Sequence, residues 1–167
     1  MKLNLCCGDK ILAGYVNVDI QNYNGVTPDV YADARRLPFA DNEVDEVLVV
    51  HAIEHFYRWE VDAVLKEWLR VLKPKAKLIL ECPNMLEACR LYVQGHQTSP
   101  VSVSDQMVMW PMYGDPRWKD PLMVHHWGYS PQTLGNVLIE AGFKDVKQEP
   151  AEFKLKEPRD MRITGVK

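Results

Sequence analysis

The sequence has no excess of basic residues. Its 20 lysine and arginine residues are outnumbered by 23 aspartate and glutamate residues, so the net charge is −3. A protein that holds nucleic acid along a groove usually carries a basic stripe to neutralise phosphates. The charge balance disfavours a protein of that class. Among nucleic-acid ligands it leaves open a nucleotide or a short RNA end.

Long apolar runs are also missing. The run Val-Leu-Val-Val at residues 47–50 is stopped by His51, far short of the ~20 residues that a membrane-spanning helix needs. Residues 1–4 lead directly into a strand-like segment, without the apolar stretch of a signal peptide. We therefore expect no membrane segment and a cytoplasmic protein.

Cysteine is scarce and is not arranged for metal or disulfides. The four cysteines are a vicinal pair and two distant residues, with no C-x-x-C spacing, namely Cys6, Cys7, Cys82 and Cys89. This pattern is not a disulfide framework, and it makes a zinc site unlikely. The sequence predicts reduced thiols and no metal, with Cys82 and Cys89 both in the core.

What the sequence does contain is an alternation of strands and helices. At 167 residues the natural expectation is one domain. Apolar runs on both faces, such as residues 45–50, are typical of central parallel strands. We predict strands at residues 2–7, 15–20, 29–32, 45–50, 77–82, 143–149 and 162–166.

Three helices stand between or after these strands. Apolar residues recur at helical spacing from Val61 to Leu72, and Pro74 ends that helix. Another helix covers residues 85–93. The last has Ser130 as its N-cap, Pro131 in its first turn and Gly142 at its C-cap. The alternation predicts an α/β fold with a doubly wound parallel sheet, interrupted by an irregular, aromatic insert at about residues 86–129.

Parallel sheets bind ligands beyond the carboxyl ends of their strands. The first strand ends in Leu-Asn-Leu-Cys-Cys-Gly, where a small residue lets backbone N–H groups approach a ligand. Asp19 can accept the two hydroxyls of a ribose, or be a solvated strand-end acid. Asp33 can accept from an adenine amino group, or cap a turn. Each signal is weak alone.

The ordered set is more specific. After residues 4–8 come Val-Asp at 18–19, Ala-Asp-Ala at 32–34, Leu-Pro-Phe at 37–39, His-Ala-Ile-Glu-His at 51–55 and Glu-Trp-Leu-Arg-Val-Leu-Lys-Pro at 67–74. Over nearly the whole chain this resembles the class I S-adenosylmethionine-dependent methyltransferases, and most of all a compact methyltransferase type 11-like group. The resemblance implies a Rossmann-like sheet of seven strands with the last one antiparallel.

The resemblance also implies roles for individual residues. The loop of Asn4, Leu5, Cys6, Cys7 and Gly8 would pass under the methionine part of S-adenosylmethionine. Asp19 would hold the ribose, with Ile20 beside the adenine. Asp33 and Ala34 would bind the edge of the adenine, and Leu37 would supply an apolar wall. His51 would lie near the methionine amino group, while Ile53, Glu54 and His55 would form the rim.

Two features depart from the family pattern. Cys6 stands where the family has glycine, and Lys10 stands where a further glycine is common. Only residues 9–15 separate Gly8 from the next strand, about two helical turns, so the usual helix is expected to be missing. We expect a more open cofactor site and weaker binding.

Catalysis of methyl transfer needs mainly alignment, with a general base for some acceptors. The candidates for this base are His51, His125 and His126, with His55 as a further one. Structural or surface roles are open for each. The aromatic residues of the insert can either pack it onto the domain or line an acceptor pocket, and they are Trp110, Tyr113, Trp118 and Trp127.

The leading hypothesis is methyl transfer from S-adenosylmethionine to an unidentified small or medium acceptor, with homodimer formation left open. A non-catalytic module that binds S-adenosylmethionine or S-adenosylhomocysteine is the alternative, motivated by Cys6 and the missing helix. A nicotinamide-dependent dehydrogenase would need G-x-G-x-x-G, and residues 6–11 do not supply it.

Overall fold

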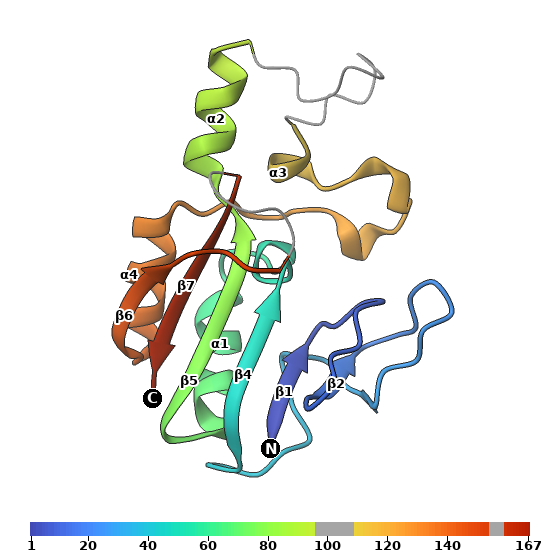
Figure 1. Ribbon diagram of the computed structural model, residues 1–167, viewed down its shortest axis with the longest axis vertical. Coiled ribbons are helices and arrows are strands. Elements are labelled where there is room, and N and C mark those ends of the chain that lie inside the picture. Colours follow the sequence, from blue (N-terminus) through green and yellow to red (C-terminus); the bar gives the residue numbers. More distant parts are fainter. Residues whose placement is uncertain (96–108, 154–158) are drawn as a thin grey trace.

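The computed structural model describes residues 1–95, 109–153 and 159–167 (Figure 1). Its seven strands form one sheet in the order β3-β2-β1-β4-β5-β7-β6. All neighbours are parallel except the two pairs made by β7, which runs antiparallel to β5 and β6. The predicted fold class is thereby confirmed. The strands are β1 Lys2–Leu5, β2 Val16–Asp19, β3 Val30–Tyr31, β4 Val44–Val50, β5 Leu72–Pro83, β6 Lys144–Glu149 and β7 Asp160–Val166.

The helices of the described chain lie against the sheet and beyond one end of it. They are α1 Val61–Val71, α2 Met85–Val93, α3 Trp110–Tyr113 and α4 Pro131–Ala141, with short 3-10 turns η1 Ile53–His55, η3 Pro116–Trp118 and η4 Pro121–Met123. Helices α1 and α4 pack on each other, and α4 also packs on β6 and β7. Helices α2 and α3 stand beyond the carboxyl ends of the central strands (Figure 1).

Helix α4 begins and ends as the sequence predicts. The side chain of Ser130 accepts from the backbone N–H of Thr133, the Thr133 hydroxyl accepts from the N–H of Ser130, and Gly142 ends the helix with a φ of 107°. That left-handed φ is easy only for a residue without a Cβ. The reciprocal cap satisfies two N–H groups that the helix cannot pair internally, which fixes where the helix begins, and Gly142 fixes where the chain turns toward β6.

The apolar stripe of α1 forms the centre of the core. Val61, Val64, Leu65 and Trp68 are all at most 1% exposed, and full burial of each such side chain contributes about 1.5–3 kcal/mol. The indole N–H of Trp68 donates to the carbonyl of Ala34 over 3.0 Å. The helix therefore also fixes the loop that follows β3.

Some expected boundaries are wrong. Leu72 is not the last helical residue but the first residue of β5, with an extended backbone. Val44 pairs with Leu72 and Glu46 pairs with Lys77, so residues 73–76 bulge opposite a single residue of β4. The strand absorbs Pro74 in this bulge, where its missing N–H costs no ladder bond.

Cys89 is a second correction. It lies on an exposed face of α2, whereas Cys82 is buried in β5 as predicted. Helix α2 buries only Ala88 among its residues. A thiol one position away therefore points to solvent, since neighbours on a helix differ by about 100°.

The link between β1 and β2 contains no helix in the described structure, as the sequence predicts. Polar side chains order it instead. The amide of Asn4 donates to the carbonyl of Lys10 and to Oδ1 of Asn17, both over 2.9 Å. Oδ1 of Asn17 also accepts from the N–H of Leu12 over 2.9 Å. The two buried asparagines supply the link with the hydrogen bonds that a helix would have made internally.

The part of the predicted insert at residues 96–108 lies outside the described residues. Residues 86–95 of the insert lie in and just after α2, and residues 109–129 run beyond the carboxyl ends of β1 and β4 (Figure 1). Among the described residues, no helix has the length and apolar character to cross a membrane. The described part of the insert is therefore placed over the edge of the sheet where a ligand would bind.

Candidate functional site

The loop after β1 is tied to the end of β2 by Asp19. The backbone N–H of Gly8 donates to Oδ2 of Asp19 over 2.8 Å, and the N–H of Ile20 donates to Oδ1 over 2.7 Å. Cys6 and Gly8 both have left-handed φ angles, 53° and 55°. These two reversals turn the chain sharply enough for the loop to meet Asp19.

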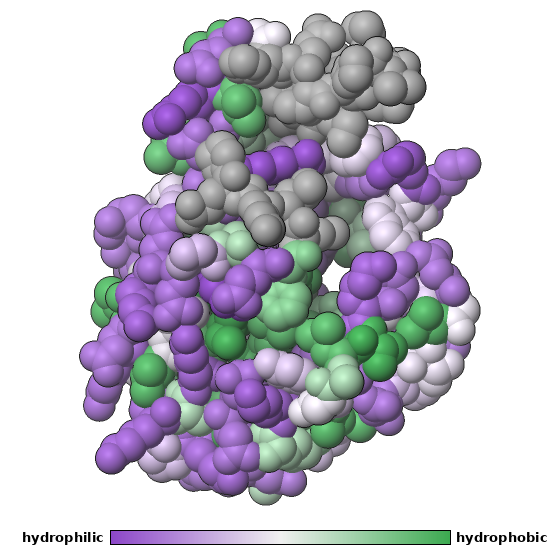
Figure 2. Space-filling view, in the orientation of Figure 1, coloured by the Kyte–Doolittle hydropathy of each residue, from purple (hydrophilic) through white to green (hydrophobic). Residues whose placement is uncertain are grey.

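The surroundings of Asp19 fit a nucleoside. Its carboxylate is 6% exposed, and each oxygen keeps a lone pair beyond the one used by the loop. A Cβ placed on Gly8 would meet nothing within 4 Å, so the space beside the loop is open. Ile20 is 50% exposed and offers an apolar edge next to the carboxylate. Apolar surface (green) crosses the lower half of the face in Figure 2, and the surface is hollowed above it.

The loop after β3 is positioned by its backbone. The carbonyl of Ala34 is held by Trp68, and the N–H of Leu37 donates to Oε1 of Glu67 over 2.7 Å. Asp33 accepts from the N–H of Arg35 over 2.8 Å and forms an ion pair with its guanidinium. The Asp33 carboxylate is thus ordered at the sheet edge by a turn and an ion pair.

The thiol of Cys6 senses two carboxylates near the first loop. Burial raises the pKa of this thiol most, and the charges of Asp19 and Asp33 raise it further. Both acids therefore lie within electrostatic reach of Cys6.

The side chains of Leu5 and Ile53 have a different place. They are 0% and 1% exposed and belong to the hydrophobic core. Asn4 is 3% exposed and holds the link between β1 and β2. Of these three residues, only the backbone is available to a ligand.

His51 follows β4 and lies between two acids. Its Nε2 is 2.8 Å from Oδ2 of Asp160, and its Nδ1 is 3.3 Å from Oε1 of Glu54. Burial alone would lower the pKa of His51, but the hydrogen bond to Asp160 and the attraction of both carboxylates raise it to about 9. His51 is therefore a cation at neutral pH and is held with a left-handed φ of 52°.

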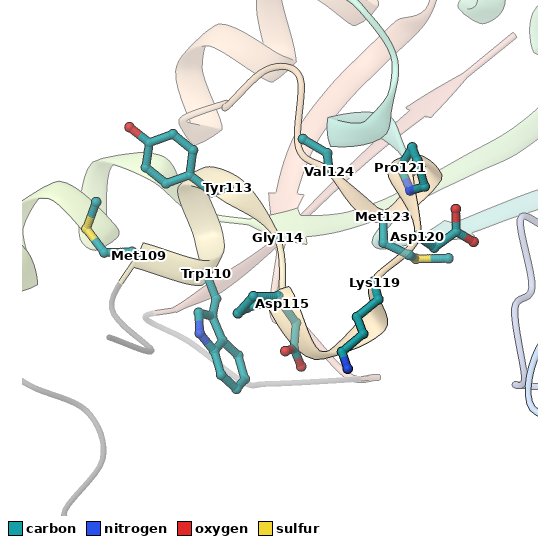
Figure 3. A pocket seen from close by; sticks show the side chains of 11 residues that line it. Met109, Trp110, Tyr113, Gly114, Asp115, Lys119, Asp120, Pro121, Met123 and Val124 are labelled. Carbon is teal, nitrogen blue, oxygen red and sulfur yellow. The ribbon is translucent and has the colours of Figure 1, made fainter. Parts of the chain in front are cut away.

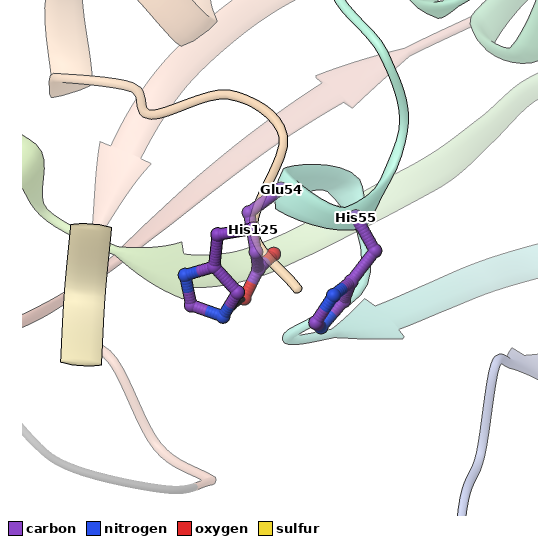
Figure 4. A group of neighbouring side chains, drawn as sticks. All are labelled: Glu54, His55 and His125. Carbon is purple, nitrogen blue, oxygen red and sulfur yellow. Dashed lines mark ion pairs between the residues drawn. The ribbon is translucent and has the colours of Figure 1, made fainter. Parts of the chain in front are cut away.

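Glu54 and the segment at residues 124–127 are joined by backbone bonds. The carbonyl of Glu54 accepts from the N–H of His126 over 2.8 Å and from the N–H of Trp127 over 3.2 Å. Nδ1 of His55 lies 3.1 Å from the carbonyl of Val124. This pairing places His125 beside η1, and its Nε2 is 3.9 Å from Oε1 of Glu54 (Figure 4).

His126 points away from this group. Its ring stacks on Tyr57 with centroids 4.0 Å apart. The histidines singled out in the sequence therefore fall into two groups. His51, His55 and His125 surround Glu54, whereas His126 packs on an aromatic side chain.

Residues 109–124 of the insert form a pocket of about 640 Å³ (Figure 3). Trp110, Tyr113, Asp115, Lys119 and Met123 are among the residues that line it. The insert is also attached to the segment after β2. Nε2 of Gln21 donates to Oδ2 of Asp120 over 3.0 Å, and the Trp118 ring contacts Tyr23 edge-on at 6.1 Å. Trp118 therefore packs the insert onto the segment after β2, while Trp110 and Tyr113 line a pocket.

Comparison with known proteins agrees with this arrangement. A family model described as "Methyltransferase domain" matches residues 12–80. A SAM-dependent methyltransferase from Archaeoglobus fulgidus is 20% identical and superposes over 99% of this chain and 85% of its own, with a TM-score of 0.64. Residues 12–80 therefore resemble a methyltransferase domain, and the chain has the fold of S-adenosylmethionine-dependent methyltransferases. These matches support the predicted family and its cofactor, S-adenosylmethionine.

Two further relatives show the breadth of this methyltransferase family. Human N-acetylserotonin methyltransferase, solved in complex with SAM, is 13% identical with a TM-score of 0.62, over 99% of this chain and 47% of that chain. The ubiquinone/menaquinone biosynthesis C-methyltransferase UbiE of Chromobacterium violaceum is 28% identical over 72% of this chain and 48% of its own length. The chain thus spans about half the length of this curated relative.

Sequence reasoning missed two acids of the methyltransferase domain as functional residues. Glu54 was expected only at the rim and Asp160 was not singled out, yet both contact His51. Asp160 begins β7, more than 100 positions after His51, and only the antiparallel pairing of β7 with β5 brings it there. The one sequence signal for Glu54 was its place between two histidines, His51 and His55.

Proposed function

We propose that this chain transfers a methyl group from S-adenosylmethionine to an unidentified small or medium acceptor. The observation that carries the proposal is Asp19. It is a nearly buried carboxylate at the end of β2 that orders the loop after β1 and keeps free lone pairs toward open space. Such a carboxylate is suited to the two hydroxyls of a ribose.

The cofactor would supply a methyl group on a positively charged sulfur. In this proposal Asp19 holds the ribose, Ile20 and Leu37 border the adenine, and Asp33 with the backbone of Ala34 meets its edge. The loop of Asn4, Leu5, Cys6, Cys7 and Gly8 supports the methionine part with its backbone. The negative charges of Asp19 and Asp33, which act on Cys6, would favour the positively charged sulfur of the cofactor.

The acceptor would enter between the insert and η1. The insert pocket is mostly lined by large apolar and aromatic residues, with Asp115, Lys119 and Asp120 as charged groups. Such a lining suits an acceptor with an aromatic or apolar body and a polar end. His51 is a cation that could orient the acceptor, whereas burial lowers the pKa of His125, which could receive a proton.

The cellular setting forms part of the proposal. The free state of all four cysteines agrees with a reducing, cytoplasmic location. We also keep the prediction that residues 1–167 form one domain, with homodimer formation through the aromatic insert left open.

Transfer of labelled methyl from S-adenosylmethionine to a panel of acceptors tests the proposal. The panel holds aromatic amines, phenols, carboxylic acids and nucleosides. Label in at least one class, abolished by Asp19→Ala, is the expected result. Cofactor binding with no transfer to any class would instead indicate the non-catalytic module.

A further inference from the structure

Three potential metal ligands meet at the end of β4. One ligand atom from each of Glu54, His55 and His125 lies within 4.8 Å of the others. Figure 4 shows the Glu54 carboxylate between the two imidazole rings. Glu54 and His55 come from η1, while His125 comes from the insert, 70 positions later along the chain. Two separate segments thus converge on one point.

Glu54 is a buried carboxylate without a hydrogen bond. It is 2% exposed, and neither side-chain oxygen has a hydrogen-bond partner among the described residues. His51 lies 3.3 Å away as an ion-pair partner, off the direction of a good hydrogen bond. A buried oxygen left without a partner costs about 1–3 kcal/mol, and more when it is charged. This carboxylate therefore fits a site that binds a cation.

Both histidines are oriented as metal ligands. Nδ1 of His55 lies 3.1 Å from the carbonyl of Val124, and Nδ1 of His125 lies 2.9 Å from the carbonyl of Pro111. A carbonyl only accepts, so each Nδ1 carries the proton and each Nε2 keeps its lone pair. Metal-binding histidines nearly always donate their other N–H to a carbonyl or carboxylate in this way.

We propose that Glu54, His55 and His125 bind one divalent first-row transition-metal ion, with Zn²⁺ as the best match. Two imidazoles and a carboxylate are common ligands of this metal, with bonds of about 2.0–2.2 Å. Ligands of a tetrahedral ion would lie about 3.3 Å apart at such bond lengths. The separation of up to 4.8 Å means that binding draws the ligands together by up to about 1.5 Å.

The groups around the three ligands support this site. His51 contacts Glu54 on one side and Asp160 on the other, so it can hold the carboxylate in place as a supporting partner. The backbone bonds from His126 and Trp127 to the Glu54 carbonyl fix the two segments together. The sequence offered no sign of the site because its ligands follow no cysteine motif.

Three protein ligands leave a position open on the metal, which is typical of catalytic rather than structural sites. The open position lies beside the insert pocket. On the basis of the proposed methyl transfer, an acceptor hydroxyl would bind there and lose its proton to solvent water more readily. Its oxygen would then form the bond to the methyl carbon, while the carbon–sulfur bond breaks and its electron pair stays on sulfur.

Metal binding is tested first, without any cofactor. Protein treated with a chelator and dialysed is titrated with Zn²⁺ against a chromophoric competitor, and with Co²⁺ by visible absorption. We expect one ion per chain for the wild type. We expect at least about a tenfold loss of affinity in His125→Asn and His55→Asn, each of which removes one ligand of the metal. Equal affinity in these folded variants, or no Zn²⁺ binding by the wild type, would overturn the site.

His126→Asn is the matched control. It removes the neighbouring imidazole, which stacks on Tyr57 outside the cluster, and it should leave Zn²⁺ affinity within twofold of the wild type. A loss equal to that of His125→Asn would contradict the assignment. Glu54→Gln is compared by thermal melting, and it should abolish the stabilisation that Zn²⁺ gives the wild type.

S-adenosylhomocysteine binding is measured on the same samples with and without chelator. The site predicts unchanged S-adenosylhomocysteine affinity together with loss of methyl transfer to a hydroxyl acceptor when the metal is removed. Failure of S-adenosylhomocysteine to bind at all would overturn the proposed function and leave the Zn²⁺ result standing. Full transfer by metal-free protein would overturn the role of the metal in the reaction.

Discussion

The backbone N–H of Gly8 donates to Oδ2 of Asp19 over 2.8 Å, so one carboxylate both orders the loop after β1 and faces the space beside it. This relationship links two strands that are neighbours in the sheet, β1 and β2. A ligand that binds Asp19 therefore also meets the backbone of the loop. The strongest effects of mutation on cofactor binding are expected here.

Asp19→Asn should weaken S-adenosylhomocysteine binding by at least about tenfold, or 1.4 kcal/mol. The amide keeps one accepting oxygen but loses the charge and the second acceptor. Isothermal titration measures the effect. Asp29→Asn is the control, because Asp29 likewise accepts two hydrogen bonds from Asn17 but lies at the start of β3. Equal losses in both variants would show that Asp19 acts only through stability.

Cys6→Gly should strengthen S-adenosylhomocysteine binding several-fold. Cys6 holds a left-handed φ of 53°, which costs a residue with a Cβ about 1–2 kcal/mol. Glycine removes that strain and the bulk beside the ligand, while loss of the thiol's packing offsets the gain in stability. Cys7→Gly is the control, since Cys7 is buried and has no left-handed φ. It should lower the melting temperature without raising affinity.

Protonation of Glu67 should lower the stability of the folded protein in acid. Its carboxylate accepts from Arg70 and from the N–H of Leu37, and the hydrogen bond to Arg70 is the largest cause that lowers the pKa of Glu67 below its usual 4.5. A lowered pKa contributes stability above about pH 4.5 that is lost as the pH falls through the folded-state value. Urea unfolding of Glu67→Gln at several pH values checks this.

At pH 7 the free energy of unfolding of Glu67→Gln should be about 1–2 kcal/mol lower than that of the wild type. This difference should shrink steadily below pH 4.5. A difference that stayed constant down to pH 2 would mean that the charge of Glu67 contributes nothing. The variant should also loosen the loop at Leu37 and weaken binding of the adenine part.

Cys89 should be the thiol that reacts first in the native protein. It is exposed on α2, whereas burial raises the pKa of Cys7 to about 11 and raises those of Cys6 and Cys82 as well. Thiolates are the reactive form, so at pH 8 a thiol reagent should label one cysteine quickly. Cys89→Ser should remove that fast phase, and two or more fast thiols in the wild type would contradict the assignment.

The sheet could be predicted from the sequence because its strands are short apolar runs with clear ends. Residues 47–50 and 78–80 are apolar on both faces, and the caps of α4 are written in Ser130 and Gly142. The bulge at residues 73–76 could not be read, because Pro74 suggests a break rather than a strand that continues around it. Nor did the apolar pattern of α2 show which face would carry Cys89.

The candidate site was predictable in its cofactor half only. Asp19 and Asp33 end strands in order along the chain, so their meeting follows from parallel topology. The group around Glu54 depends on contacts between distant segments. His125 reaches it through the backbone bonds of residues 124–127 to η1, and Asp160 through the pairing of β7 with β5. Neither contact can be predicted from local sequence, because each joins segments that are far apart along the chain.

Titration of the wild-type protein with S-adenosylhomocysteine measures whether the edge formed by Gly8, Asp19 and Asp33 binds the cofactor. We expect saturable heat with one site per chain. We also expect a rise in thermal stability, equivalent to about 2.7 kcal/mol at a ligand concentration of 100 times Kd. No heat and no change in melting temperature at millimolar ligand would contradict the proposed function, because this edge would then not bind the nucleoside.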